Sequence, residues 1–370
     1  MTWISPAVIG AIASATQPST VFNLNYFQAI QTANWSAVQA NIQSTISSAT
    51  TSDTTSTFGT FSGSFKYAGG VLAPNGIIYT IPANSTSILK LDTADDSTST
   101  FGTFSGTDKW NGGILAENGC IYGIPRSSST VLKIDPSDDS TSTFGSLSGS
   151  NNWIGGVMAP NGMIYGIPFG STTVLKINPT NDTVSTFGSL SGSNKWVGGV
   201  LAPNGMIYGI PFASGPILKI DPTTDSATTF GSTSGGSTKW NGGVLADNGM
   251  IYAIPYSSSE VLKIDPTDDS TSTFGSLSGS NKWAGGILGP NGIIYGIPFG
   301  AGDILKIDPS DDSASTFGSV TGSNRWNGGV MAGNGVAYAI PSSSTEILKV
   351  TPANNSFNVE ILKSGYFNKL

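Results

Sequence analysis

The sequence contains no histidine and a single cysteine, and these absences exclude much of the usual catalytic chemistry. Without histidine the chain cannot form a Ser-His-Asp triad, a Cys-His pair or a His-ligated metal site. One cysteine also rules out a disulfide framework and a zinc site built from several cysteines. Cys120 occupies a position that is Ile, Met or Val in the repeats described below, so we interpret it as a core residue.

Charged residues are scarce as well, at 11% of 370 positions, and the formal net charge is −7. An acidic balance without a clustered basic tract argues against nucleic acid as a partner. No stretch approaches the roughly 20 consecutive apolar residues of a membrane span. Ser, Thr, Gly and Asn fill the surface positions instead, as in proteins that persist outside cells, so we expect a virion or extracellular protein.

A unit of about 43 residues recurs seven times and accounts for most of the chain. The aromatic residues that open the units are Tyr67, Trp110, Trp153, Trp196, Trp240, Trp283 and Trp326. Within the unit at Trp196, "GGVLAP", "MIYGIP", "ILKID" and "SATTFGS" are short apolar or β-branched runs separated by turn residues. The Asn-Gly dipeptide between the first two runs is a strong hairpin signal. Each unit is therefore predicted to be a four-stranded antiparallel meander.

The order of these runs resembles the NHL type of β-propeller repeat, and the paired glycines resemble kelch repeats. The resemblance covers about residues 54–365. It implies an all-β fold, a seven-bladed β-propeller of four-stranded antiparallel blades at residues 51–370. It implies little about function, because propellers carry many unrelated activities.

The first 50 residues lie outside the repeat. An apolar run ending at Ala13-Ser14-Ala15 partly resembles a secretory signal, but it lacks a basic start and contains Pro6. The alternative is an apolar arm that packs against another surface. Helical spacing of apolar residues predicts one amphipathic helix from about Asn25 to Ser48. We expect residues 1–50 to serve in docking or oligomerisation with other virion or surface proteins.

The N-terminal segment also bears on how the ring closes. "TTSTFGTFSG" at Thr54 to Gly63 duplicates the fourth-strand text "STSTFGTFSG" at Ser97 to Gly106. We predict that it pairs with the last blade and so removes two exposed sheet edges. The C-terminal "NSFNVEILKSG" is the competing candidate for this place.

Charged residues repeat with the units. Basic residues precede most of the opening aromatics, and a lysine lies in every third run; together these positions hold 13 of the 16 basic residues. Asp residues gather around the "DPTDD" turns. A ligand-binding ring or calcium sites are one interpretation, but Asp-Pro-x-x-Asp is ordinary turn chemistry. We favour a structural role for these charges, and a packing role for the ring of Trp residues over sugar stacking.

Variation between the units falls on one predicted face, formed by the loops after the second run and by the connections between blades. Four successive units carry an aromatic there, and one carries an arginine; the residues are Phe169, Phe212, Tyr256, Phe299 and Arg126. Acidic residues stand at the far end of the last three of these loops, at Glu260, Asp303 and Glu346. We predict that these eight residues bind a glycan or a host-surface protein, with the aromatics exposed at loop tips. Equivalent positions on adjacent blades are expected to lie too far apart for one small metabolite to span all of them, which favours an extended or repeated ligand.

Catalysis has little support in the sequence. Arg126 and Arg325 are too few for the arginine cluster of a sialidase-type propeller, and no local motif supports a carboxylate pair among Glu117, Glu260, Asp303 and Glu346. We therefore expect a non-catalytic structural or binding protein without a cofactor, such as a phage tail, fibre or head appendage. A secreted or cell-surface propeller is the alternative, including a metal-dependent hydrolase or lactonase that binds its metal with Glu, Asn and Asp.

Overall fold

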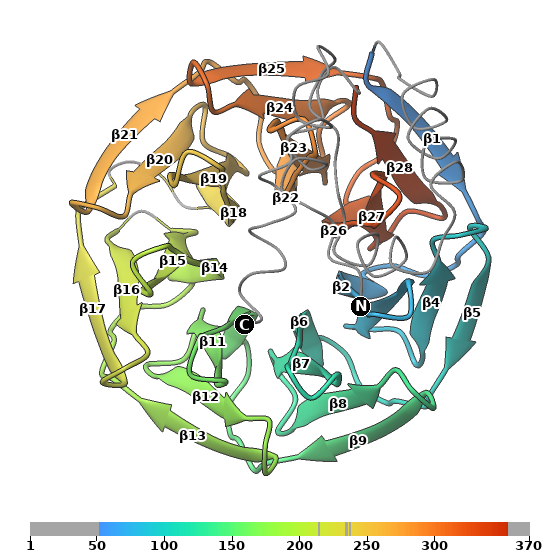
Figure 1. Ribbon diagram of the computed structural model, residues 1–370, viewed down its shortest axis with the longest axis vertical. Coiled ribbons are helices and arrows are strands. Elements are labelled where there is room, and N and C mark those ends of the chain that lie inside the picture. The colour runs from blue at the N-terminus through green and yellow to red at the C-terminus, as the bar shows by residue number, and fades with distance from the viewer. Residues whose placement is uncertain (1–51, 214, 234–235, 237, 354–370) are drawn as a thin grey trace, which may run out of the picture.

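The computed structural model describes residues 52–213, 215–233, 236 and 238–353. Within this part the chain forms seven four-stranded antiparallel sheets arranged as blades around a central axis (Figure 1). The predicted seven-bladed all-β propeller is confirmed. The predicted helix at Asn25 to Ser48 and the N-terminal arm lie outside the described residues.

The first two strands of each blade lie nearest the axis (Figure 1). The innermost strands are, for blades 1 to 7, β2 (Tyr67–Leu72), β6 (Trp110–Leu115), β10 (Trp153–Met158), β14 (Trp196–Leu201), β18 (Trp240–Leu245), β22 (Trp283–Leu288) and β26 (Trp326–Met331). The second strands are β3 (Ile77–Pro82), β7 (Ile121–Pro125), β11 (Ile164–Pro168), β15 (Ile207–Pro211), β19 (Ile251–Pro255), β23 (Ile294–Pro298) and β27 (Ala337–Pro341).

The third and fourth strands form the outer part of each blade. The third strands are β4 (Ile88–Asp92), β8 (Val131–Asp135), β12 (Val174–Asn178), β16 (Ile217–Asp221), β20 (Val261–Asp265), β24 (Ile304–Asp308) and β28 (Ile347–Thr351). The fourth strands, at the rim, are β5 (Thr98–Phe101), β9 (Ser140–Phe144), β13 (Thr183–Phe187), β17 (Ser226–Phe230), β21 (Ser270–Phe274), β25 (Ser313–Phe317) and β1 (Thr54–Phe58).

The ring is closed by the N-terminal strand, as predicted. β1 pairs antiparallel with β28, in a register that sets Thr54 opposite Thr351 and Phe58 opposite Ile347. The last blade therefore has the order β1-β28-β27-β26 and takes its rim strand from the start of the repeat region. Phe58 packs against the apolar cluster shared by blades 7 and 1.

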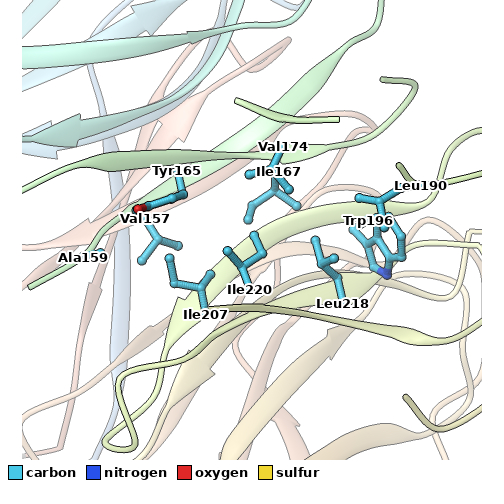
Figure 2. Packing of buried hydrophobic residues seen from close by; sticks show 10 residues of the cluster. All are labelled: Val157, Ala159, Tyr165, Ile167, Val174, Leu190, Trp196, Ile207, Leu218 and Ile220. Atoms are coloured by element: carbon cyan, nitrogen blue, oxygen red, sulfur yellow. The ribbon is translucent and has the colours of Figure 1, made fainter. Parts of the chain in front are cut away.

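The core consists of apolar layers between neighbouring blades. Figure 2 shows the layer between blades 3 and 4, where Trp196 lies beside Leu190 and Leu218 in a cluster that includes Ile167 of the preceding blade. Trp196 is 3% exposed, and its indole N–H donates to the carbonyl of Pro216 at 2.9 Å. The other opening aromatics are also buried. The packing interpretation of the Trp ring is thus confirmed, since a buried indole fills the layer and has its hydrogen-bond partner.

The paired glycines let the innermost strands approach one another. In each innermost strand the register shifts between the opening aromatic and the second glycine, as between Trp196 and Gly199. The first glycine has a positive φ, 74° at Gly155 and 72° at Gly198. A Cβ atom on Gly155 would lie 2.9 Å from the Cα of Gly198 in the next blade, so no side chain fits there. Glycine is needed for both the backbone conformation and the close approach.

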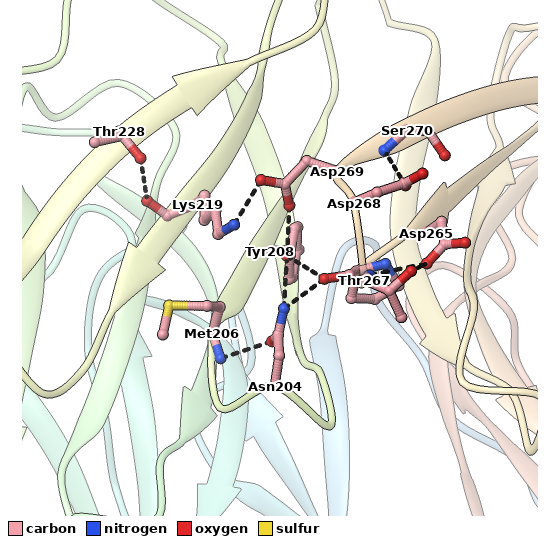
Figure 3. A network of polar contacts seen from close by, with 11 residues as sticks. Asn204, Met206, Tyr208, Lys219, Thr228, Asp265, Thr267, Asp268, Asp269 and Ser270 are labelled. Carbon is pink, nitrogen blue, oxygen red and sulfur yellow. Dashed lines mark hydrogen bonds and ion pairs between the residues drawn. The ribbon is translucent and has the colours of Figure 1, made fainter.

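Adjacent blades are also joined by a repeated polar cluster, drawn in Figure 3 for blades 4 and 5. Asp269 accepts hydrogen bonds from the Tyr208 hydroxyl at 2.7 Å and from Lys219 Nζ at 2.5 Å. Asn204 donates to the Tyr208 hydroxyl and to the carbonyl of Pro266. The aspartate ends a turn in the left-handed conformation, with φ of 60°. The carboxylate that we interpreted as turn chemistry also connects two blades.

The same ion pair occurs at every junction between blades. The pairs are Lys90–Asp139, Lys133–Asp182, Lys176–Asp225, Lys219–Asp269, Lys263–Asp312, Lys306–Asp53 and Lys349–Asp96. At the closing blade the carboxylate belongs to Asp53, just before β1, because this blade has no turn between its third and fourth strands. In each turn with two consecutive aspartates, the first aspartate accepts a hydrogen bond within the turn itself. Asp268, for example, accepts from the backbone N–H of Ser270. The structural interpretation of the repeated acids is supported by these contacts.

Candidate functional site

Loops and turns separate onto opposite faces of the propeller, as predicted. The loop after a second strand meets the connection to the next blade; for example, Lys109 N donates to the carbonyl of Ala83 at 3.1 Å and Phe104 N to that of Thr86 at 2.8 Å. We call this side the loop face. The Asn-Gly turns and the Asp-Pro turns meet on the other side, where Asn204 contacts Pro266. We call that side the turn face.

The four variable aromatics of the loop face lie against one another. The ring centroids are 5.6 Å apart for Phe169 and Phe212, 5.7 Å for Phe212 and Tyr256, and 5.6 Å for Tyr256 and Phe299. Each residue directly follows the end of a second strand, so the fold sets the four rings side by side across blades 3 to 6. We call this row the aromatic arc. It is a continuous surface and not four separate loop tips.

The burial of the arc corrects one expectation. Phe169 and Phe299 are each only 8% exposed, so the prediction that they are exposed is wrong. Phe212 and Tyr256, in the middle of the row, are half-buried and remain accessible. The two end residues are the more buried ones although each has a single ring neighbour, so residues other than the rings cover them.

Residues of the innermost strands support the arc from below. Ile154 and Val197, which directly follow their opening Trp residues, pack with Phe169 and Phe212 in one cluster. The same position is occupied by half-buried Asn111, Asn241 and Asn327 in other blades. Sequence reasoning missed this layer, although its signal, a variable residue after the recurring aromatic, was present in the repeat.

The arc ends where blades 7, 1 and 2 carry other residues. Ser342 and Ala83 are small and buried, whereas Arg126 is half-buried. Arg126 donates through Nε to Asn151 Oδ1 at 2.9 Å and through Nη1 to Asp108 Oδ1 at 3.1 Å. Its charge is therefore balanced by Asp108, and its orientation is fixed by two contacts.

The three predicted carboxylates lie at the outer ends of their loops, directly before the third strands. The main-chain carbonyls of Glu260, Asp303 and Glu346 accept the indole N–H of Trp240, Trp283 and Trp326, at 2.9, 2.9 and 2.8 Å. No hydrogen bond or ion pair joins their side chains to the aromatic arc in the part of the chain that the structure describes. The structure thus brings the four aromatics into contact, and it gives the main chain of the three acids a structural role as acceptors of the Trp indoles.

Most of the basic residues before the opening aromatics are buried and hold the loops together. Lys282 is 3% exposed, and its Nζ donates to the carbonyls of Ser258 and Gly279 at 2.7 and 3.0 Å. It also lies 5.6 Å from the centroid of the Trp283 ring. Burial lowers the pKa of Lys282 to about 8. Because these cations are covered, the loop face presents hydroxyl, amide and aromatic groups in place of a charged ring.

Two cavities lie on the turn face, away from the variable residues. One, of about 430 Å³, is lined by Asn161, Met163, Lys176, Asn178, Thr183 and Ser185. The other, of about 390 Å³, occupies the equivalent place in blade 5. Both are built from repeated residues, and their lysines are already paired with Asp225 and Asp312. We therefore place the candidate site at the aromatic arc.

Two further properties concern metals and membranes. Among the described residues no three or more His, Cys, Asp or Glu side chains gather in a way that could hold a metal ion. The described part of the chain also has no helix with the length and apolar character needed to cross a membrane.

Sequence comparison gives a partial match. Residues 199–363 match a family described as "Repeat of unknown function (DUF6923)". No curated protein matches the chain.

Solved structures share the architecture at low identity. A catalytically inactive variant of virginiamycin B lyase from Staphylococcus aureus, with quinupristin, is 11% identical with a TM-score of 0.71, over 81% of this chain and 99% of that one. An auxiliary nutrient binding protein from Bacteroides ovatus is 13% identical with a TM-score of 0.54, over 81% and 77%. The extracellular domain of a one-component system from B. thetaiotaomicron is 10% identical with a TM-score of 0.60, over 80% and 42%. At these identities the likeness shows the fold, and the chain is a repeat protein folded as a seven-bladed β-propeller.

Proposed function

We propose that the protein is a non-catalytic β-propeller that binds a neutral glycan on its loop face, as an extracellular or virion component. The observation that carries the proposal is the aromatic arc. The blades share most of their core and turn residues, whereas the arc covers only blades 3 to 6. A feature that departs from the repeat is not required for each blade to fold. The arc is therefore the part of the surface that we assign to ligand binding.

The chemistry of the arc suits a sugar. Phe212 and Tyr256 expose ring surface on which the C–H faces of a pyranose stack, and neighbouring hydroxyl and amide groups supply hydrogen bonds. Asn111, Asn241 and Asn327 lie half-buried on the innermost strands. Most cations of this face are buried, and Arg126 is neutralised by Asp108, so little positive charge is offered to an acidic ligand. These properties favour a neutral glycan over an acidic one.

A binding role is favoured over catalysis by the residues present. In the inactive lyase variant a histidine is replaced by alanine, and this chain has no histidine with which to supply similar chemistry. The aspartates at the junctions between blades are engaged by lysine and tyrosine, as Asp312 is by Lys263 and Tyr252. The alternative of a metal-dependent hydrolase or lactonase therefore has no observation in its favour.

An extracellular place is supported by two of the similar structures, one an extracellular domain and one a nutrient binding protein. The composition agrees, with few charges and a surface of Ser, Thr, Gly and Asn. A role in a virion rests on composition alone.

Replacing Phe212 and Tyr256 with Ser is expected to leave the propeller folded and to reduce glycan affinity at least tenfold, roughly what the loss of a central aromatic contact costs. Binding is measured on an array of neutral oligosaccharides and then by calorimetry with the best ligand. The matched control is Met163→Ser with Met250→Ser, which removes half-buried apolar groups from the turn face. Equal affinity of the arc variant and the natural chain would contradict the proposal.

Residues 1–50 are proposed to dock the propeller to other copies or to a partner. A chain that begins at Ser52 keeps Asp53 and β1 and so retains a closed ring. We expect it to be a soluble monomer, while the full chain self-associates through its apolar N-terminal residues. Light scattering on both chains measures this. A full chain that is monomeric at micromolar concentration would count against the docking role.

A further inference from the structure

Phe65 departs from the repeat in two ways. Its side chain is 44% exposed, which makes it the one strongly exposed large hydrophobic residue among those the structure describes. Its φ is +47°, in the left-handed region that bulky side chains rarely adopt. Phe65 lies on the loop face, in the connection that leads from β1 to β2 and so joins blades 7 and 1.

The equivalent residues of the other blades show what the backbone prefers there. They all have positive φ between 49° and 64°, and they are Asp108, Asn151, Asn194, Thr238, Asn281 and Asn324. Asp and Asn tolerate the left-handed conformation because their short polar side chains bond locally. A phenylalanine at this position has no polar side chain that could stabilise the left-handed conformation, and its ring is not buried in compensation. Folding and solubility therefore give no reason for Phe65, and a strained, exposed residue of this kind is typical of a functional surface.

Two hydrogen bonds hold the backbone of Phe65 and so fix the point from which its ring projects. Its N–H donates to Ser343 Oγ of blade 7 at 3.0 Å, and its carbonyl accepts from Asn84 N of blade 1 at 3.1 Å. The adjoining Lys66 is buried, and its Nζ donates to the carbonyls of Gly63 and Ser344. The groups that contact Phe65 through its backbone are thus a hydroxyl and a backbone N–H, and among the described residues no other aromatic ring is in contact with its ring.

This setting identifies the chemical class of the ligand. A protein partner usually anchors an aromatic residue within a well-packed apolar patch from which water is excluded. A single ring bordered by neutral hydrogen-bonding groups suits one sugar unit, which stacks through its C–H face and bonds through its hydroxyl groups. In Figure 1 blade 7 stands next to blade 6, where the arc ends at Phe299, and blade 1 follows it, so Phe65, between blades 7 and 1, lies beyond that end of the arc. Two stacking surfaces so placed require an extended ligand.

We infer that Phe65 is a second stacking platform of the loop face and that the ligand is a neutral oligosaccharide long enough to reach it from the aromatic arc. The inference rests on the proposed function and adds the length of the ligand and a second subsite. The two contacts order the backbone at Phe65 before the ligand binds, which reduces the entropy lost by this connection on binding.

The test is the Phe65→Asn variant, which restores the residue type of most other blades. We expect it to fold at least as stably as the natural chain, with a melting temperature higher by on the order of 2 °C because the backbone strain is relieved. The probes are neutral oligosaccharides of glucose, galactose, mannose and N-acetylglucosamine, from monosaccharides to long oligomers. Affinity for long oligomers should fall about tenfold, while affinity for short ones stays unchanged.

The matched control is Asn281→Phe, which places the same side chain in the same conformation between blades 5 and 6. It should lower the melting temperature, and it is used for stability alone because Asn281 contacts the loops that follow Tyr256 and Phe299. A lower melting temperature for Phe65→Asn would overturn the inference, since Phe65 would then serve stability. A different result would overturn the second platform alone. In that case Phe65→Asn leaves the binding of long oligomers intact, whereas Phe212→Ser with Tyr256→Ser abolishes it. Failure of the natural chain to bind any probe would overturn both this inference and the proposed function.

Discussion

Removing residues 1–63 is expected to lower the melting temperature of the propeller markedly, because this change takes away both the rim strand of the last blade and its link to blade 6. β1 supplies the whole ladder opposite β28, and its loss exposes that strand as a new sheet edge. Phe58 also leaves the apolar cluster between blades 7 and 1. We expect a loss of several kcal/mol of unfolding free energy, measured by thermal and denaturant melts.

Much of this loss comes from Asp53. Its side chain is 7% exposed and accepts hydrogen bonds from Lys306, Tyr295 and the backbone N–H of Ala353. Burial acts to raise the pKa of Asp53, but the contacts from Lys306, Tyr295 and Ala353 outweigh it and lower the pKa. Deletion leaves a partly buried lysine and tyrosine without their partner, which is costly in a low-dielectric site.

The control is the chain that begins at Ser52, which keeps Asp53 and should melt like the full chain. If removal of residues 1–63 leaves the melt unchanged, another segment closes the ring, and the C-terminal "NSFNVEILKSG" is the candidate.

Gly155→Ala is expected to destabilise the propeller by about 3 kcal/mol, the sum of a left-handed alanine and an overpacked contact. The new Cβ would lie 2.9 Å from the Cα of Gly198, and neither backbone can move without disturbing the next blade. The first glycines approach one another around the whole ring, so the strain is not confined to one junction.

Gly162→Ala is the matched control, because φ there is +78° and a Cβ atom at this position would have no neighbouring atom within 4 Å. It should cost only about 1 kcal/mol, the conformational part alone. Denaturant unfolding of both variants separates the two contributions. Equal losses would mean that contact between the innermost strands does not limit the residue at position 155.

The fold could be predicted from the sequence because the features that define its turns, strands and blade contacts recur in every repeat. The Asn-Gly turn, the paired glycines and the Phe-Gly end of the rim strand occur at fixed offsets, and the copy of that text before Tyr67 identified the closing strand. Periodicity also divided the chain into a uniform turn face and a variable loop face, because loops at opposite ends of strands must lie on opposite sides.

The candidate site was predicted in part. The four aromatics were found as departures from the repeat, but their mutual contact was not, since the period gives the position of a residue in its own blade and not its distance from the next blade. Burial of Phe169 and Phe299 was missed as well, because it depends on packing with other strands and loops, such as that of Ile154 and Val197 with Phe169. Asp53 and Phe65 were missed although both have counterparts in the repeat, since Asp53 matches Asp96 and Phe65 stands where the other units carry Asp, Asn or Thr. Their importance depends on contacts with another blade and on backbone conformation, which the period does not give.

Hydrogen–deuterium exchange of the full chain, with and without the neutral oligosaccharide that binds best on the array, tests the central claim most directly. The account predicts that the ligand slows exchange in the loops that follow Phe169, Phe212, Tyr256 and Phe299 and in the connection at Phe65, and leaves the Asn-Gly turns of the opposite face unchanged. Protection confined to the turn face, or spread evenly over all seven blades, would contradict it.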